Sequence, residues 1–300
     1  MIVIVAAAAI YGVFVVSERD SEDGESGIIN VTTSFYPLYY LASEIGGDKA
    51  RVSVVTPPGA EPHEYEPTAR DIARIEGSDL FVANGAHFEA WADGVVSNLD
   101  PDRTHVIFAG EPHADGLFVH DDEEETDPHV WLAPSLAAKM ATLILESYAA
   151  IDPENENTYR ANALGLSLRL AALDASYKRA LATCEKRDIV TTHSAFGYLS
   201  SAYNLRQVAI AGLSTKEEPS ARDLANISLF ARENDVRYIF FESLVSSKLA
   251  DTIATEVGAQ TLVLNPLEGL TDEEVASGAD YFSVMNQNLS NLVKALSCTI

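Results

Sequence analysis

Residues 152–181 read DPENENTYRANALGLSLRLAALDASYKRAL, and this stretch predicts the architecture of the chain. Asp152 and Pro153 are typical of a helix cap followed by a first-turn proline. From Tyr159 to Leu181 an apolar residue recurs every three or four positions, which is the pattern of one amphipathic helix. Such a helix would be roughly 45 Å long at ~1.5 Å per residue. A coiled-coil arm is the alternative, but the heptads are not sustained. We therefore expect a helix that joins two lobes.

Short apolar runs typical of strands alternate with helical patterns on both sides of this helix. Before it they lie at 28–34, 51–56, 79–84 and 104–109, and after it at 188–192, 207–211, 237–241 and 260–264. Such alternation indicates parallel strands with crossover helices. We predict an α/β fold of two lobes, each a parallel sheet with flanking helices. The N-terminal lobe covers 28–150, the linking helix 151–185 and the C-terminal lobe 186–300.

The first residues differ in composition from the rest. Residues 1–16 are apolar, and residues 17–27 are polar and acidic. The apolar run is shorter than the ~20 residues of a spanning helix, but it fits a signal-peptide core or a short membrane anchor. We expect a signal or anchor segment at 1–16 and an acidic linker at 17–27, with the folded part working outside the cytoplasm, in the periplasm or at the outer face of the membrane. No cysteine follows the run, so we do not expect a lipid anchor on cysteine.

The overall charge narrows the classes of partner. The 300 residues include 20 Lys and Arg but 45 Asp and Glu, which gives a formal net charge of −25. Such acidity argues against nucleic acid as a partner, because phosphates require basic patches. The two cysteines, Cys184 and Cys298, form no metal-type cluster. A disulfide is open in an oxidising compartment, but we favour two unpaired thiols.

Three histidines follow predicted strands or lie on a stiff loop. His63 lies in a loop with four prolines after the run 51–56, and His193 directly follows the run 188–192. His129 lies in the sequence TDPHVWL at 126–132, where Pro128 disfavours helix at the preceding residue and Trp131 anchors the loop. In such sheets, ligands bind beyond the carboxyl ends of the strands. Neutral imidazoles with a carboxylate suit zinc, so we predict that these histidines share a metal site between the lobes.

The other four histidines are weaker candidates. We expect His87 and His105 to be structural. His113 and His120 flank a segment that ends in the acidic run 121–125. This segment either gathers metal loosely or is an ordinary solvated loop, and both interpretations stay open.

Several short motifs, taken in order, resemble one family, the metal-binding solute-binding proteins of ABC importers for zinc and manganese. The resemblance covers nearly everything from about Ile28 onward. It rests on PHEYEP at 62–67, Asn84-Gly85 with Glu89 and Trp91, DPHVWL at 127–132, THSAFGY at 192–198, EPS at 218–220, and DYFSVM at 280–285 with Asn288-Leu289. The resemblance implies a metal held in the cleft between two lobes joined by a long helix. It also implies delivery of that metal to a membrane permease and its ATPase.

The resemblance also implies a fourth ligand. Many members have an aspartate just after the last strand, where this chain has Asn265, and an amide is a poor zinc ligand beside a carboxylate. Relatives with a similar Asn-Pro-Leu-Glu sequence use the glutamate, so the role passes to Glu268, with Glu242 as the less favoured substitute. Members of the manganese type tend to replace the third histidine with a carboxylate. Because this chain keeps His193, we expect Zn²⁺ rather than Mn²⁺, bound by His63, His129, His193 and Glu268.

We therefore predict a monomeric extracytoplasmic receptor that captures zinc and passes it to an ABC permease. A manganese receptor or a metal-binding adhesin of the same fold is the alternative. A zinc hydrolase is less favoured, because nothing resembles His-Glu-x-x-His and a fourth ligand would close the coordination sphere. We expect no enzymatic activity, no nucleic-acid partner, and membrane contact only through the N-terminal segment.

Overall fold

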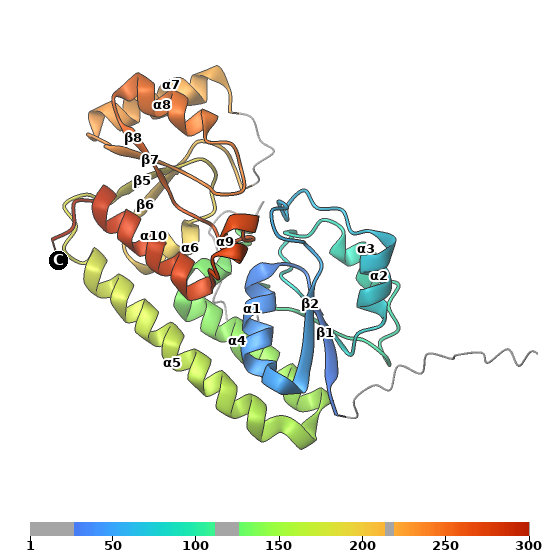
Figure 1. Cartoon of the computed structure of the whole chain (residues 1–300). Helices are drawn as coiled ribbons and strands as arrows, with labels where there is room; N and C mark the ends of the chain where they lie inside the picture. The colour runs from blue at the N-terminus through green and yellow to red at the C-terminus, as the bar shows by residue number, and fades with distance from the viewer. Residues whose placement is uncertain (1–26, 112–125, 214–218, 300) are drawn as a thin grey trace, which may run out of the picture.

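The structure of the chain is a computed structural model that describes residues 27–111, 126–213 and 219–299. It contains two lobes, each built on a four-stranded parallel sheet with helices on both faces (Figure 1). The predicted fold class is confirmed. The predicted signal or anchor segment, the acidic linker, and His113 and His120 lie outside the described residues.

The N-terminal lobe has the strand order β2-β1-β3-β4. Every pair is parallel, with Val31 opposite Val52 and Leu80, and Phe81 opposite Val106. All four residues of β3 are buried, because helices cover both faces of the sheet. The elements of the N-terminal lobe are β1 (Ile29–Thr33), α1 (Tyr36–Gly46), the 3-10 turn η1 (Gly47–Lys49), β2 (Ala50–Val54), α2 (Ala69–Glu76), β3 (Leu80–Ala83), α3 (Ala92–Val96), β4 (His105–Phe108), the 3-10 turn η2 (Val130–Leu132) and α4 (Pro134–Ile151).

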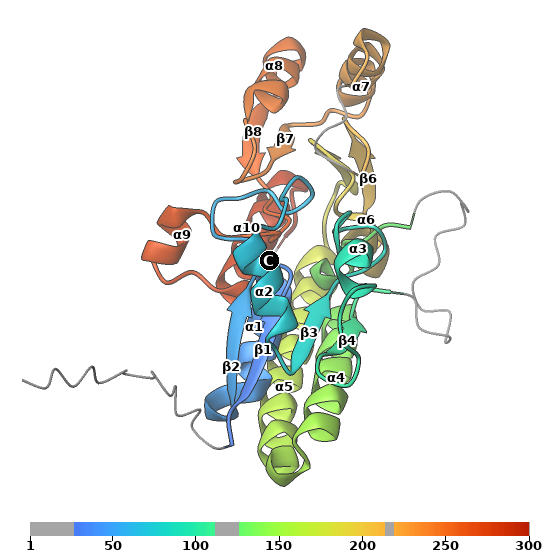
Figure 2. The ribbon, with the colours of Figure 1, turned by 90° about the vertical axis from the view of Figure 1, so that its right-hand side faces the viewer.

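The C-terminal lobe repeats this topology with the strand order β6-β5-β7-β8. Its pairs are again parallel, with Val190 opposite Val208 and Ile239. Helices α7 and α8 cover one face, and Figure 2 shows them at the end of the molecule far from α4 and α5. Its elements are β5 (Asp188–Thr191), α6 (Gly197–Ala202), β6 (Arg206–Ala209), α7 (Ala221–Glu233), β7 (Tyr238–Phe241), α8 (Lys248–Val257), β8 (Gln260–Val263), α9 (Asp272–Ala276) and α10 (Tyr281–Ala295).

Helix α5 (Glu156–Leu181) runs along both lobes (Figure 1). The side-chain amide of Asn162 donates to the carbonyl of Ile45 in α1, 3.0 Å away. Near the other end, the hydroxyl of Tyr177 donates to the carbonyl of Met285 in α10, 2.6 Å away. The apolar residues that predicted the helix, from Tyr159 to Leu181, are buried in one core cluster that includes residues of both lobes. The helix begins at Glu156, because Pro153–Asn155 form a separate 3-10 turn η3.

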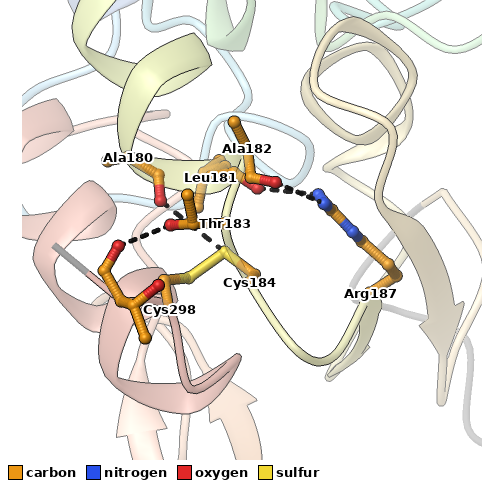
Figure 3. The surroundings of a disulfide bond; sticks show 8 residues. Ala180, Leu181, Ala182, Thr183, Cys184, Arg187 and Cys298 are labelled. Atoms are coloured by element: carbon orange, nitrogen blue, oxygen red, sulfur yellow. Dashed lines mark hydrogen bonds between the residues drawn. A yellow bond between two sulfur atoms is a disulfide. The ribbon is translucent and has the colours of Figure 1, made fainter.

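The structure corrects two expectations. The helical pattern between the strand runs 79–84 and 104–109 gives a helix only from Ala92, where α3 begins, because Ala86 and His87 have φ values of 52° and 59° and form a turn. The preference for unpaired thiols was wrong, because Cys184 and Cys298 form a disulfide (Figure 3). Cys184 follows the end of α5, and the chain after α10 returns to it, so the two cysteines face each other across an antiparallel bridge. Proximity of this kind depends on tertiary packing and leaves no local sequence signal.

Within the described part of the chain, no helix is both long and apolar enough to cross a membrane.

Candidate metal centre

The four predicted ligand residues come together between the lobes. His63 lies in the loop after β2, His129 just before η2, His193 two residues after β5, and Glu268 in the loop after β8. One ligand atom from each lies within 4.8 Å of the ligand atoms of the other three. His129, His193 and Glu268 are buried and His63 is half-buried. Parallel strands place their carboxyl ends at one edge of each sheet, and this explains why loops so distant in sequence meet here.

The ligand atoms face one another closely. The carboxylate oxygen Oε1 of Glu268 lies 3.1 Å from Nε2 of His129, 3.5 Å from Nε2 of His193 and 3.6 Å from Nε2 of His63. The Nε2 atoms of His63 and His129 are 3.3 Å apart. Three imidazole nitrogens and one carboxylate oxygen therefore surround a single point, which matches the four ligands that zinc takes in proteins.

The carboxylate of Asp127 orients the ring of His129 through the ring nitrogen Nδ1. Asp127 Oδ1 accepts hydrogen bonds from the His129 backbone N–H at 2.9 Å and from its Nδ1–H at 2.8 Å. The carbonyl of Pro128 accepts a bond from the side chain of Asn84 at 3.0 Å, which fixes the loop further. Because Asp127 holds the proton on Nδ1, Nε2 is the nitrogen left to bind a metal.

His193 is held in the same way from the other lobe. Its Nδ1–H donates to Glu242 Oε1 at 2.5 Å, and the hydroxyl of Thr192 donates to the same oxygen. The His193 carbonyl accepts bonds from Thr191 and Gln207 at 2.8 and 2.9 Å. Glu242 was the less favoured candidate for the fourth ligand. The structure places it outside the cluster of four, as the hydrogen-bond partner of His193.

His63 lies in the most exposed part of the centre. Its backbone N–H donates to Glu61 Oε1 at 3.2 Å, and its ring packs edge-on against Phe88 with the ring centres 4.5 Å apart. Glu61 also lies close to Glu268. The loop between β2 and α2 therefore brings a second carboxylate beside the centre.

Glu268 is fully buried, and the turn before it is tied to the opposite lobe. The indole N–H of Trp131 donates to the carbonyl of Pro266 at 2.7 Å, and the hydroxyl of Tyr281 donates to the carbonyl of Trp131 at 2.6 Å. Trp131 is thus hydrogen-bonded to the Glu268 turn and lies two residues after His129. These bonds link the loop of His129 in one lobe to the turn of Glu268 in the other.

In the metal-free centre, protons bound to the histidines balance the negative charge of Glu268. Burial lowers the pKa of His193, but hydrogen bonds to Glu242 and Glu268 outweigh it and raise that pKa to about 10. Burial also lowers the pKa of His129, and bonds to Asp127 and Glu268 raise it above its usual value. Burial raises the pKa of Glu268, but bonds from the three histidines outweigh it and hold that pKa well below its usual range. A metal ion entering the centre must therefore displace protons from the imidazoles of His129 and His193.

The sequence predicts the ligand candidates but not the residues that hold them in place. Asp127 lies two residues before His129 in the sequence TDPHVWL, and this spacing is the signal that points to it. Thr192 and Glu61 gave no signal beyond being neighbours of histidines. His87 and His105 are exposed and lie outside the cluster of four.

Comparison with known proteins gives consistent results. The family described as "Zinc-uptake complex component A periplasmic" matches residues 31–295. The high-affinity zinc uptake system protein ZnuA of Bacillus subtilis is 39% identical over 293 residues, which cover 93% of this chain and 91% of that protein.

Two solved structures are similar throughout. The Zn(II)-bound ZnuA-like domain of AdcA from Streptococcus pneumoniae has a TM-score of 0.79 and 39% identity, covering 90% of this chain and 99% of that domain. The chain spans 59% of the whole AdcA protein. The laminin binding protein Lmb of Streptococcus agalactiae, described as bifunctional with adhesin and metal transporting activity, has a TM-score of 0.79 and 32% identity, covering 89% of this chain and 99% of that one.

Proposed function

Because the chain belongs to the family of zinc-uptake complex component A proteins, we propose that it captures Zn²⁺ between its lobes through His63, His129, His193 and Glu268. The chain is a solute-binding receptor of a zinc importer and not an enzyme. The observation that carries the proposal is the convergence of four ligand atoms within 4.8 Å of one another. His63 and His129 come from the N-terminal lobe, and His193 and Glu268 come from the C-terminal lobe.

The donor set favours zinc over manganese. Three imidazoles and one carboxylate are borderline ligands suited to zinc, whereas manganese prefers more oxygen ligands. The single carboxylate partly neutralises the dication in a buried site. The carboxylates of Asp127 and Glu242 fix the imidazoles that bind it.

We propose a monomer that passes zinc to an ABC permease with its ATPase, outside the cytoplasm. The disulfide between Cys184 and Cys298 supports an oxidising compartment. Residues 1–16 would serve as a signal or anchor.

A transport test follows from this proposal. Cells lacking the chain should grow poorly in chelator-limited medium and recover when the parent chain or added zinc is supplied. A variant with His129→Ala should not restore growth, whereas His105→Ala, at an exposed histidine outside the cluster, should. Full recovery with His129→Ala would contradict the proposal.

An adhesin role is the second candidate, because Lmb is described as having both activities. Binding of the chain to immobilised laminin, measured with and without zinc, separates the two roles. Laminin binding together with normal growth of the deletion strain in chelator-limited medium would favour the adhesin. Zinc-dependent growth without laminin binding would favour the receptor alone.

A further inference from the structure

Asn265 ends the segment after β8 and begins the turn that brings Glu268 into the centre. Its Oδ1 accepts a hydrogen bond from the backbone N–H of Leu267 at 2.7 Å. Leu267 has φ 58°, a left-handed conformation that a leucine rarely adopts, and it is fully buried. The side chain of Asn265 thus stabilises the strained residue immediately before the ligand.

Every polar group of Asn265 has a partner. Its backbone N–H donates to Asn288 Oδ1 at 2.9 Å, and its carbonyl accepts from Asn288 Nδ2 at 2.7 Å. Its Nδ2 donates to Glu274 Oε1 at 2.9 Å. Asn265 and Asn288 are both buried, so each of these bonds is costly to lose.

The partners of Asn265 require an amide at this position. One side of the group must accept from an N–H, and the other side must donate to a carboxylate. An aspartate would place its oxygen against Glu274 Oε1 at hydrogen-bond distance, where two carboxylates repel. Glu274 cannot turn away freely, because its Oε2 also accepts from the N–H of Thr271 at 2.8 Å in the cap of α9.

We propose that Asn265 is a positioning residue for the metal centre, and that Glu274 makes an aspartate at position 265 unfavourable. Asn265 holds the turn that carries Glu268, so zinc receives its carboxylate from position 268. This inference rests on the proposed zinc site and adds the residues that decide which carboxylate serves it.

The test exchanges the amide at position 265 and the carboxylate at position 274. Asn265→Asp should raise the Kd for zinc about 10- to 100-fold, which is the usual effect of disturbing a residue that supports a metal ligand. Adding Glu274→Gln should bring the Kd back toward the parent value. In this double variant, the introduced glutamine can donate to the introduced aspartate and still accept from Thr271. Zinc affinity is measured by competition with a chelator on the metal-stripped full chain.

A matched control separates positioning from general stability. Asn291 lies one turn after Asn288 in α10, and its Nδ2 donates to the carbonyl of Val263 at the end of β8, 2.8 Å away. Asn291→Asp should lower the unfolding temperature of the metal-free chain and leave the Kd for zinc unchanged. If Asn265 were only structural, Asn265→Asp would behave in the same way.

The outcomes are distinct. A parent chain that binds no zinc would refute the proposed function itself. A parent chain that binds zinc, with an Asn265→Asp variant of equal affinity, would refute this inference alone. Failure of Glu274→Gln to restore affinity in the folded double variant would refute the role of Glu274.

Discussion

At the level of single residues, the rings of the three histidines in the centre are held in place by different contacts. His129 and His193 are each held by a buried carboxylate at Nδ1, from Asp127 and Glu242. His63 instead depends on a proline-containing loop and on contact with Phe88. Because all three belong to loops, their removal should affect the metal more than the fold.

Replacing any one ligand should therefore weaken zinc binding strongly. For His63→Ala, His129→Ala and His193→Ala we expect a loss of several kcal/mol out of the ~10–16 kcal/mol typical of tight zinc sites. Glu268→Gln should raise the Kd well over tenfold, which is more than ~1.4 kcal/mol. Competition titration measures these losses, with His105→Ala as the matched control. Parent-like affinity in any two of the histidine variants would show that the ligand set is wrong.

The protons of the metal-free centre predict a pH dependence. The pKa of His193, raised to about 10, and the raised pKa of His129 mean that their protonated forms stabilise the fold. This stabilisation is complete below the usual histidine pKa of about 6.5 and is lost as the pH rises toward the folded-state pKa. Burial, and then the charge of Glu268, raise the pKa of Glu61 to about 9. The folded chain therefore keeps the Glu61 proton at pH values where the unfolded chain has lost it, so this group also lowers stability as the pH rises toward 9.

The chelator-stripped chain should accordingly be less stable at pH 9 than at pH 6.5. Urea unfolding at the two values measures the difference. Zinc affinity should change in the opposite direction, because fewer protons compete for the imidazoles at high pH. If the free energy of unfolding of the metal-free chain stays constant or rises between pH 6.5 and pH 9, the raised pKa values of His193, His129 and Glu61 are contradicted.

At the scale of elements, the disulfide joins the two ends of the C-terminal lobe. Cys184 follows α5 and Cys298 follows α10, 114 residues apart in sequence, so the bond closes the whole lobe into one loop. Next to it, the hydroxyl of Thr183 donates to the carbonyl of Thr299. Figure 3 shows the bonds from Arg187 to the carbonyls of Leu181 and Ala182.

Removing this bond should cost stability without changing the metal centre. Loop-closure entropy predicts a loss of up to about 5 kcal/mol for Cys184→Ser combined with Cys298→Ser. Thr183→Ala, which removes only the neighbouring hydrogen bond, should cost about 1 kcal/mol. Urea unfolding of the metal-free chains compares them. An altered zinc affinity in the serine variant would show that the disulfide also shapes the centre.

The loop of His129 and the turn of Glu268 should act as one unit through Trp131. Trp131→Phe removes the bond to Pro266, and we expect weaker zinc binding. Trp91 offers the control, because its indole N–H is buried and has no hydrogen-bond partner among the described residues. Trp91→Phe should leave the zinc affinity unchanged. Equal effects of the two substitutions on the zinc Kd would contradict a special role for Trp131.

The sequence patterns predicted those features that depend on residues close together in the chain. Strand runs and helical periodicity were sufficient for the two sheets and α5, and His63 and His193 were found because strand ends in such sheets share an edge. Glu268 came from the resemblance to a family and not from spacing. The pattern could not show that Glu242 bonds to His193 and lies outside the cluster of four, because both positions suit a carboxylate at a strand end. The pairing of Cys184 with Cys298 depends on how α10 returns to α5, which no local pattern records.

At the scale of the whole molecule, the two lobes share one core, and the proposed ligands come from both lobes. The largest buried cluster contains residues of both sheets together with α4, α5 and α10. Zinc bound between the lobes would add a direct link across them. Since such a ligand binds only the folded state, zinc should raise the free energy of unfolding by ~4 kcal/mol at a free concentration 1,000 times its Kd.

Zinc X-ray absorption on the chain loaded with one equivalent of zinc tests the proposed ligand set directly. We predict four ligands, of which three are imidazoles, with zinc–nitrogen distances of ~2.0–2.1 Å and one carboxylate oxygen. The imidazole count should fall to two in a variant with His193→Ala. A parent spectrum with two imidazoles or fewer, or with a sulfur ligand, would show that zinc is not bound by the three histidines and Glu268.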